Sequence, residues 1–325
     1  MTKVLITTIP FGNPEPKPLH LLEKAGIEYT INPFNRKITE SDLKEIINDY
    51  DGLIAGTEKI SKEVIDLAPK LKIISRVGVG TDGVDLNYAR ERDIKVTYTP
   101  DAPGPAIAEL AVGFMYSLLR STHVSNLQVR NGKWNRSIGR SFSDMTIGIF
   151  GAGRVGSKVI DLINKIGCKK ILVSDIYHNE TLREQYGFEW ASKETIYKEA
   201  DIISLHIPLT ADAKGMIKKE QLLAMKEDAL LINTARGGII DEKDLYDVMK
   251  TGHIGGVAID VFEQEPYSGT LIEIERCLIT PHIGSASREC RAKMELESVL
   301  EIIRYFNNQE LESPVPETEY LLQQK

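Results

Sequence analysis

Cysteine is scarce in this chain of 325 residues, which contains only Cys168, Cys277 and Cys290. They are widely spaced and form no C-x-x-C pair, which argues against a disulfide framework and against a zinc site. We expect no bound metal. Positive charge is also in the minority, because 40 Lys and Arg face 47 Asp and Glu, for a formal net charge of −7. A nucleic-acid-binding face needs clustered Lys and Arg, so we expect no nucleic-acid partner.

Long hydrophobic runs are missing as well. The most apolar predicted helix, Ala106–Leu119, is interrupted by Glu109 and is shorter than the ~20 residues that span a bilayer. The apolar run Val4–Ile9 is too short for the core of a signal peptide. The composition, 42% hydrophobic and 27% charged, is that of an ordinary globular protein of about two domains. We therefore expect a cytoplasmic protein without a membrane partner.

The first hundred residues alternate short apolar strands with helices. The predicted strands are Val4–Ile9, Tyr29–Asn32, Gly52–Ala55, Lys72–Ser75 and Lys95–Thr97. The predicted helices between them are Pro18–Ala25, Ser41–Asn48, with Thr39 or Ser41 as its N-cap, and Lys62–Ala68. Such alternation predicts a parallel α/β domain.

A second alternating block follows the apolar helix, which opens after Pro103 and continues helically toward Gly132. Its predicted strands are Ile147–Phe150, Ile171–Ser174, Ile202–His206, Leu230–Asn233, Gly256–Ile259 and Leu278–Thr280. Helices lie between them, for example Gly153–Ile166 and Lys219–Met225. Six strands in this pattern predict a doubly wound sheet.

The end of the chain is read as a return to the first domain, through a helix over Ser287–Asn307 and a polar tail after Ser313. We therefore expect an α/β protein with two Rossmann-like domains of doubly wound parallel sheets. Residues 1–101 and 287–325 form a discontinuous substrate domain, and residues 102–286 form an inserted cofactor domain. Small ligands are expected in the cleft between the two.

The most informative motif is the glycine-rich turn after the strand Ile147–Phe150. Gly151 permits the tight turn, Gly153 lets the backbone approach a pyrophosphate, and Gly156 lets the following helix pack closely on the sheet. The helix N-terminus then faces the pyrophosphate with unpaired N–H groups. Asp175 ends the next strand, nineteen residues after Gly156, where a carboxylate binds the adenosine ribose.

The same carboxylate favours NAD over NADP. A 2′-phosphate beside Asp175 would place two negative charges together, and NADP sites usually supply an arginine nearby. The residues that follow Asp175 include no arginine before Arg183.

Three further polar clusters follow predicted strands, and strand C-termini are where ligands bind in an open α/β sheet. They contain Arg236, Glu265 and His282. Oxidation of a 2-hydroxy acid requires a base for the hydroxyl proton, and histidine is the side chain that titrates near neutrality. A carboxylate such as Glu265 fixes the tautomer of the histidine, and Arg236 can bind the substrate carboxylate and polarise the C2 oxygen.

Each residue also has a plainer interpretation. His282 can be a loop residue, Arg236 can cap a helix, and Glu265 can lie in a solvated turn before Pro266. The joint occurrence of all three after a dinucleotide fingerprint favours the catalytic interpretation.

These motifs together resemble the D-isomer-specific 2-hydroxyacid dehydrogenases. The resemblance rests on the stretches Asn233–Gly238, Asp260–Pro266 and Pro281–Gly284 and spans essentially the whole chain. It implies an NAD-dependent enzyme, typically a homodimer, in which Arg236 binds the substrate, Glu265 partners the histidine and His282 donates and accepts the proton. The homodimer would be built on the cofactor domains.

The resemblance also implies cofactor contacts beyond the glycines and Asp175. Arg154 and Val155 would lie at the pyrophosphate, and a segment through His206, Pro208 and Thr210 would form the wall around the adenine and ribose. The residues implied near the nicotinamide or next to the catalytic histidine are Thr234, Ala235, Asp260, His282 and Gly284. His206 is the main rival for the base, and the resemblance makes it a wall residue.

In the first domain, the stretch Arg76–Asp85 most resembles the phosphoglycerate dehydrogenase branch. Backbone N–H groups of the loop Val77-Gly78-Val79-Gly80 are candidates to hold the substrate carboxylate, although a plain glycine-rich turn is the alternative. Arg76 either pairs with a phosphate on C3 of the substrate or is a structural ion-pair residue. The segment Thr99–Pro105 departs from the branch, and we expect no regulatory domain at the C-terminus.

We therefore predict an NAD-dependent D-2-hydroxyacid dehydrogenase whose substrate is a small 2-hydroxy or 2-keto acid, with 3-phosphoglycerate as one candidate. A glyoxylate or hydroxypyruvate reductase is one alternative. A non-catalytic, NADH-sensing binding protein of the corepressor type is another, because fold alone does not settle function.

Overall fold

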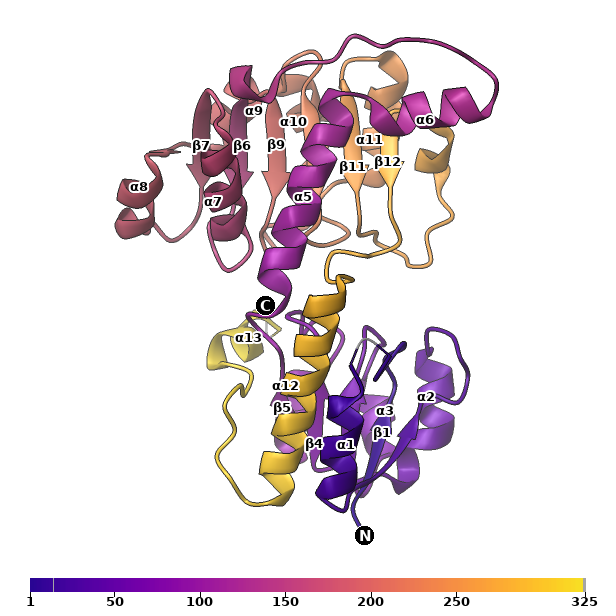
Figure 1. Ribbon diagram of the computed structural model, residues 1–325. Helices are drawn as coiled ribbons and strands as arrows, with labels where there is room; N and C mark the ends of the chain where they lie inside the picture. The colour runs from indigo at the N-terminus through magenta and orange to yellow at the C-terminus, as the bar shows by residue number, and fades with distance from the viewer. Residues whose placement is uncertain (14, 324–325) are drawn as a thin grey trace. The chain divides into compact units, whose positions relative to one another are not determined.

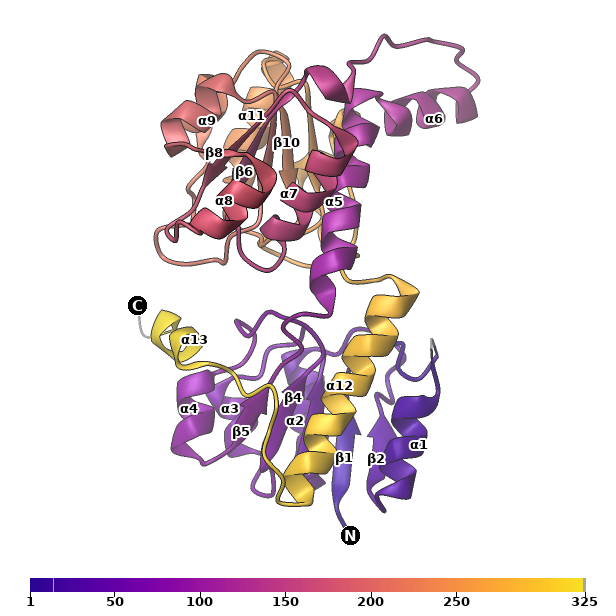
Figure 2. The same ribbon diagram turned by 60° about the vertical axis from the view of Figure 1, so that its left-hand side comes forward.

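The computed structural model describes residues 1–13 and 15–323. The chain divides into two compact units, which Figures 1 and 2 show from two sides. Unit 1 consists of Met1–Pro103 together with Ser285–Lys325, and unit 2 consists of Gly104–Gly284. Both are α/β structures with parallel sheets, so the predicted fold class is confirmed.

Unit 1 contains a parallel sheet of five strands in the order β2-β1-β3-β4-β5. The strands are β1 (Lys3–Ile6), β2 (Glu28–Ile31), β3 (Gly52–Ala55), β4 (Ile73–Arg76) and β5 (Lys95–Thr97). The prediction that the first strand runs to Ile9 was wrong. Pro10 has no N–H to give a ladder, and Thr7 is the last residue that still bonds β3, through its N–H to the carbonyl of Ile54.

Unit 1 also contains helices. They are α1 (Lys17–Lys24), α2 (Glu40–Ile46), the short 3₁₀ helix η1 (Ile47–Asp49), α3 (Lys62–Asp66), α4 (Leu86–Glu91), α12 (Arg288–Phe306) and α13 (Glu317–Leu322). Thr39, one of the two predicted caps, accepts from the N–H of Asp42 at the start of α2. The C-terminal segment pairs with β5, because Val315 donates its N–H to Val96.

Unit 2 contains a parallel sheet of seven strands in the order β12-β11-β10-β9-β6-β7-β8. The strands are β6 (Thr146–Phe150), β7 (Lys170–Ser174), β8 (Glu189–Trp190), β9 (Ile202–Leu205), β10 (Leu230–Asn233), β11 (Gly256–Ile259) and β12 (Cys277–Ile279). In chain order this is the doubly wound arrangement, which reverses direction between β6 and β9. The six predicted strands all form, and β8 is an additional edge strand of two residues.

Two hydrophobic cores lie on the two faces of this sheet. On one face pack α5 (Pro103–Leu119) and α7 (Gly156–Ile166), and on the other pack α9 (Lys193–Glu199), α10 (Lys219–Ala224) and α11 (Glu242–Thr251). The remaining helices are α6 (Thr122–Arg130), α8 (Glu180–Tyr186), and the short 3₁₀ helices η2 (Phe142–Asp144) and η3 (Thr270–Glu273).

One helix start predicted for unit 2 needs correction. The helix after the glycine turn begins at Gly156 rather than Gly153, because Gly153 to Val155 still form the turn. The apolar helix ends at Leu119 as predicted, and helical structure resumes as α6 after Ser121, which has φ +48°. In the part of the chain that the structure describes, no helix is both long and apolar enough to cross a membrane.

Candidate active site

The turn between β6 and α7 is shaped by its glycines. Gly151 has φ +90°, and a Cβ there would lie 2.5 Å from the carbonyl oxygen of His206. A Cβ on Gly156 would lie 1.8 Å from the carbonyl oxygen of Gly151, so neither position tolerates a side chain. A Cβ on Gly153 would meet none of the described atoms within 4 Å. An open turn without side chains at the start of a helix fits the pyrophosphate of a dinucleotide.

Asp175 is tied to this turn through its carboxylate. Oδ2 accepts from the N–H of Ala152 at 2.6 Å, and Oδ1 accepts from the N–H of Tyr177 at 2.9 Å. The side chain is half-buried at the end of β7, and each oxygen keeps a lone pair for a ribose hydroxyl. Ile176 beside it is fully exposed, and its uncharged side chain offers no cation to a 2′-phosphate.

The wall segment follows β9. The His206 imidazole bonds to Ser204 Oγ through Nε2 at 2.9 Å, while Nδ1 is enclosed without a hydrogen bond among the described residues. Burial lowers the pKa of His206 to about 3. A group with that pKa holds no proton near neutrality and is a weak base, which disfavours His206 as the rival catalytic histidine. Pro208 is exposed, and Thr210 Oγ1 accepts from the N–H of Ala213.

Arg236 lies in a loop after β10 that a single asparagine organises. Asn233 Nδ2 donates to the carbonyl of Arg236 at 2.9 Å, and Asn233 Oδ1 accepts from the N–H of Ala235 at 3.0 Å. The half-buried guanidinium of Arg236 donates to the carbonyl of Ala235 at 2.7 Å. A Cβ on Gly237 would lie 2.1 Å from the backbone of Phe262, so the glycine allows this loop to pack on the loop after β11.

Thr234 supplies a second sign that this loop faces a ligand. Its Oγ1 is buried and has no hydrogen-bond partner among the described residues. Buried hydroxyl groups normally find a partner, so a bound molecule with a polar group is the natural one here. The open glycine turn, the Asp175 carboxylate and the Thr234 hydroxyl together fit a dinucleotide.

His282 and Glu265 form a hydrogen-bonded pair. His282 Nδ1 lies 3.0 Å from Glu265 Oε2 and 3.1 Å from Oε1. Glu265 Oε1 also accepts from the N–H of Phe262 at 3.3 Å, which fixes the carboxylate. The His282 side chain is 37% exposed and that of Glu265 is 22% exposed. Because Nδ1 is engaged with the carboxylate, Nε2 is the ring nitrogen that can exchange a proton with a substrate.

The backbone of His282 has φ +56°, a left-handed conformation that is costly for a residue with a Cβ. Asp260 stabilises it from the neighbouring strand. Oδ1 accepts from the N–H of Ile283 and Oδ2 from the N–H of Gly284, each at 2.7 Å. Oδ1 also accepts from Thr280 Oγ1 at 2.5 Å. Burial raises the pKa of Asp260, while these hydrogen bonds and the His282 charge oppose the rise.

The glycine-rich loop of unit 1 follows β4. The N–H of Val77 donates to the carbonyl of Ala55 and the N–H of Gly78 donates to Thr99 Oγ1, so two of the four candidate N–H groups are engaged within the unit. Val79 and Gly80 donate no backbone N–H bond to another described residue. The Arg76 side chain is 7% exposed and donates to the carbonyls of Val77 at 3.1 Å and Ala55 at 3.5 Å.

The sequence predicts the reactive side chains of this site but not the residues that hold them. Asn233 is one of these supports, and its signal in the sequence is an asparagine at a strand end before a tight loop, which is typical of an Asx-turn. Thr280 is another, and its bond to Asp260 is visible only in three dimensions. Within residues 1–13 and 15–323, no three His, Cys, Asp or Glu side chains are grouped to hold a metal ion.

Residues 112–284 match the family described as D-isomer specific 2-hydroxyacid dehydrogenase, NAD binding domain. The chain belongs to this family. It is therefore an NAD-dependent oxidoreductase that acts on the CH–OH group of 2-hydroxy acids. The matched stretch covers almost all of unit 2, which contains the open glycine turn and the His282–Glu265 pair.

Relatives within the family carry different names. A hydroxypyruvate reductase from Thermotoga maritima is 33% identical over 87% of this chain and 92% of its own length. A glyoxylate reductase from Thermococcus litoralis is 38% identical over 78% of this chain and 79% of its own length. A D-3-phosphoglycerate dehydrogenase from Methanocaldococcus jannaschii is 35% identical over 90% of this chain, which spans only 55% of that protein.

Proposed function

We propose that this dehydrogenase uses NADH to reduce a small, unphosphorylated 2-keto acid of the glyoxylate or hydroxypyruvate class, or oxidises the matching 2-hydroxy acid with NAD. The sequence left 3-phosphoglycerate open as a substrate, through a pairing of Arg76 with the phosphate. The observation that carries the present proposal is the position of the Arg76 guanidinium.

Arg76 supports the architecture of unit 1. Its guanidinium donates to the carbonyls of Ala55 and Val77, which ties the end of β3 to the end of β4. A Cβ on Gly78 would lie 3.4 Å from Nη1, so the glycine makes room for the folded arginine. An arginine that is 7% exposed and bonded to backbone carbonyls is poorly placed to meet an incoming phosphate.

The side chains of the site have separate roles in the proposed reaction. Arg236 binds the substrate carboxylate and polarises the C2 oxygen. His282 Nε2 delivers a proton to the keto oxygen, and Glu265 stabilises the charged imidazole and fixes its orientation. NADH held by these residues would provide the hydride for reduction at C2. We assign the N–H groups of Val79 and Gly80, in the loop after β4, to a further contact with the substrate.

The cofactor assignments belong to the same proposal. Gly151, Gly153 and Gly156, with Arg154 and Val155, bind the pyrophosphate, and Asp175 binds the ribose and selects NAD over NADP. The segment with His206, Pro208 and Thr210 lines the adenosine half. The residues assigned to the nicotinamide half are Thr234, Ala235, Asp260 and Gly284.

Initial rates of NADH oxidation with a panel of 2-keto acids test the proposal. We expect kcat/KM for glyoxylate or hydroxypyruvate to exceed that for 3-phosphohydroxypyruvate by about tenfold or more, a difference of ~1.4 kcal/mol. The variant R76A is expected to lower the melting temperature without changing this ratio. A parent that prefers the phosphorylated acid would overturn the proposal. NADH binding without turnover of any acid would instead favour the corepressor-type alternative.

We also propose that the enzyme is a homodimer built on unit 2. Residues 131–139 are all exposed, and they include Trp134 at 83% and Ile138 at 101% exposure. Figure 1 shows α6 and this segment extending away from the body of unit 2. Exposure of large apolar side chains to water is unfavourable, so we expect a partner surface to cover this segment. Most soluble oligomers are symmetric assemblies of identical chains, and we therefore propose a second copy of this chain as the partner.

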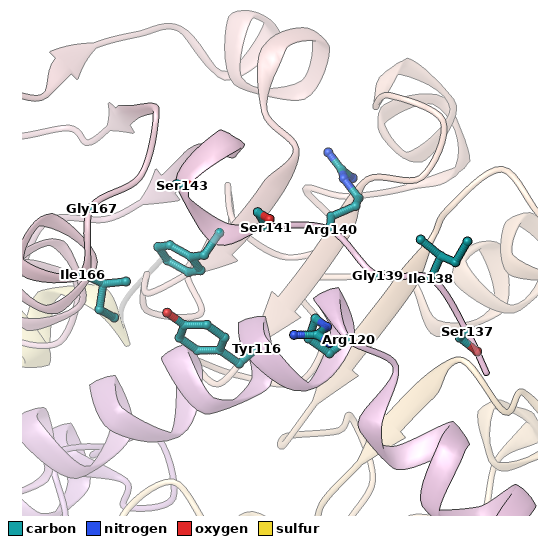
Figure 3. A pocket seen from close by; sticks show the side chains of 11 residues that line it. Tyr116, Arg120, Ser137, Ile138, Gly139, Arg140, Ser141, Ser143, Ile166 and Gly167 are labelled. Atoms are coloured by element: carbon teal, nitrogen blue, oxygen red, sulfur yellow. The ribbon is translucent and has the colours of Figure 1, made fainter.

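A cavity of about 680 Å³ lies beside this segment (Figure 3). Tyr116 of α5 and Arg120, just after the end of that helix, line it opposite Arg140 and Ser141. Tyr116 stacks on Phe142 with ring centroids 5.1 Å apart. The α5 helix buries one face inside unit 2 and exposes a stripe through Glu109, Gly113 and Tyr116. We propose that the second copy covers this stripe and the cavity.

A cytoplasmic location is part of the proposal. It rests on three cysteines that form no disulfide, which suits a reducing compartment.

A further inference from the structure

A buried glutamate lies at the C-terminal edge of the unit 1 sheet and has no part in the assignments above. Glu58 follows β3 by three residues and is 5% exposed. Ionisable side chains are rarely buried unless they have a function or their polar atoms all have hydrogen-bond or ion-pair partners. Its surroundings therefore decide what it does.

The hydrogen bonds of Glu58 all reach one oxygen. Oε1 accepts from the N–H of Gly56 at 3.0 Å and from the hydroxyl of Thr7. The hydrogen bonds of the described residues do not involve Oε2. A Cβ on Gly56 would lie 2.8 Å from Oε2, so the glycine leaves space beside that oxygen. Half of the carboxylate is thus fixed by the protein, and the other half is available.

This carboxylate belongs to the same sheet edge as the glycine-rich loop. The N–H of Val77 bonds to the carbonyl of Ala55, the last residue of β3. The carbonyl oxygen of Glu58 lies 3.0 Å from the position of a Cβ on Gly83, and the N–H of Ile60 donates to Gly83. Ala55 and Ile60, which flank the Glu58 segment, are therefore bonded to Val77 at the start of the assigned loop and to Gly83, three residues beyond its end. Carboxyl ends of parallel strands are where ligands bind.

We propose that Glu58 is a specificity-determining residue, whose Oε2 accepts a hydrogen bond from a hydroxyl or ammonium group on C3 of the 2-keto acid and repels a phosphate there. A carboxylate is an acceptor only, and a charge-assisted hydrogen bond to it is strong. Two negative charges in a partly buried site repel each other. The inference rests on the proposed function and narrows its substrate to acids with a donor on C3.

A purely structural role is the competing explanation, since Oε1 already supports Gly56 and Thr7. The variant E58Q separates the structural explanation from the specificity role. A glutamine keeps the shape of the side chain and one acceptor oxygen, but it replaces the other oxygen with an NH₂ donor and removes the negative charge. We expect kcat/KM for hydroxypyruvate relative to pyruvate, which lacks the C3 hydroxyl, to fall by about tenfold or more. The relative rate with 3-phosphohydroxypyruvate should rise, while kcat/KM for pyruvate stays within about twofold.

The surface variant E91Q removes the same charge from an exposed site of unit 1 and should change none of these ratios. An equal loss for every substrate in E58Q, with a lower melting temperature, would mark Glu58 as structural and overturn the inference. If E58Q does not fold, the inference is tested on the parent enzyme, where equal kcat/KM values for hydroxypyruvate and pyruvate would contradict it. If the parent is active on 2-keto acids and E58Q leaves the ratio of kcat/KM for hydroxypyruvate to that for pyruvate unchanged, only the role of Glu58 is refuted. A parent inactive on every acid refutes the proposed function as well.

Discussion

The carboxylate of Asp260 holds the backbone N–H of Ile283 at 2.7 Å, immediately beside the candidate proton donor His282. With the second bond to Gly284, this contact keeps His282 in its left-handed conformation, φ +56°. Such a conformation costs on the order of 1–2 kcal/mol for a residue with a Cβ. The aspartate that the family resemblance places at the nicotinamide is therefore also a positioning residue for the histidine.

Replacing Asp260 by asparagine should uncouple these two roles. An amide can accept at only one of its two positions, so at least one of the bonds to Thr280, Ile283 or Gly284 is lost. We expect kcat to fall by about tenfold or more while the Kd for NADH, measured by fluorescence titration, changes little. The variant T280V, which removes one donor to the same carboxylate, should show a smaller loss of the same kind. A large rise in the Kd for NADH with unchanged kcat would assign Asp260 to the cofactor alone.

Asp175 should control the choice between NADH and NADPH. D175A is expected to lower the NADH to NADPH ratio of kcat/KM by about tenfold, since it removes a like-charge repulsion of ~1.4 kcal/mol against the 2′-phosphate. Adding I176R supplies a cation at a fully exposed position and should lower the ratio further. E184A, which removes an exposed charge from α8, is the matched control. Equal use of both cofactors by the parent would show that Asp175 does not discriminate.

The regular parts of the fold were predictable from the sequence because each follows from a local pattern. Apolar runs such as Ile147–Phe150 and Gly256–Ile259 are buried on both faces of a parallel sheet, and the structure places strands there. The two-residue strand β8 and the polar helix α13 carry no such pattern and were missed. The true start of α7 depends on the contact of Gly156 with Gly151, which no local rule contains.

The reactive side chains of the site could likewise be predicted from the sequence, whereas the residues that hold them in position could not. His282, Glu265 and Arg236 belong to motifs whose residue types suit the chemistry. The bonds from Asn233 to its own loop, from Thr280 to Asp260 and from Glu58 to Thr7 join residues whose spacing has no recognisable period. The loop N–H groups of Val77 and Gly78 were expected to be available, and the fold uses them internally.

The enclosed imidazole of His206 should make stability depend on pH. Burial lowers its pKa from 6.5 to about 3 in the folded chain. Between these values the unfolded chain binds a proton that the folded chain does not. The contribution of the neutral His206 to the free energy of unfolding is therefore fully present above about pH 6.5 and is lost as the pH falls toward 3. The melting temperature of H206N should therefore drop less than that of the parent between about pH 7.5 and pH 5. The exposed-site control H20N should drop as the parent does, and an H206N curve parallel to the parent would contradict the enclosure.

The exposed segment around Trp134 should govern assembly. We expect light scattering at micromolar concentration to give the parent a dimer mass, and W134S/I138S to shift it toward the monomer, because burial of large apolar side chains drives association. I272S, at another exposed apolar site of unit 2, is the control and should remain dimeric. A monomeric parent would refute the proposed dimer.

The central claim is that His282, held by Glu265, exchanges the proton with the C2 oxygen of a 2-keto acid. The most direct test is the single-substrate kcat for hydroxypyruvate or glyoxylate in the parent and in H282A, with NADH binding and melting temperature measured in parallel. Removal of a general acid typically costs ~10²–10⁴-fold in rate. We expect a loss of kcat in that range, with NADH affinity and stability unchanged. An H282A enzyme as active as the parent would contradict it.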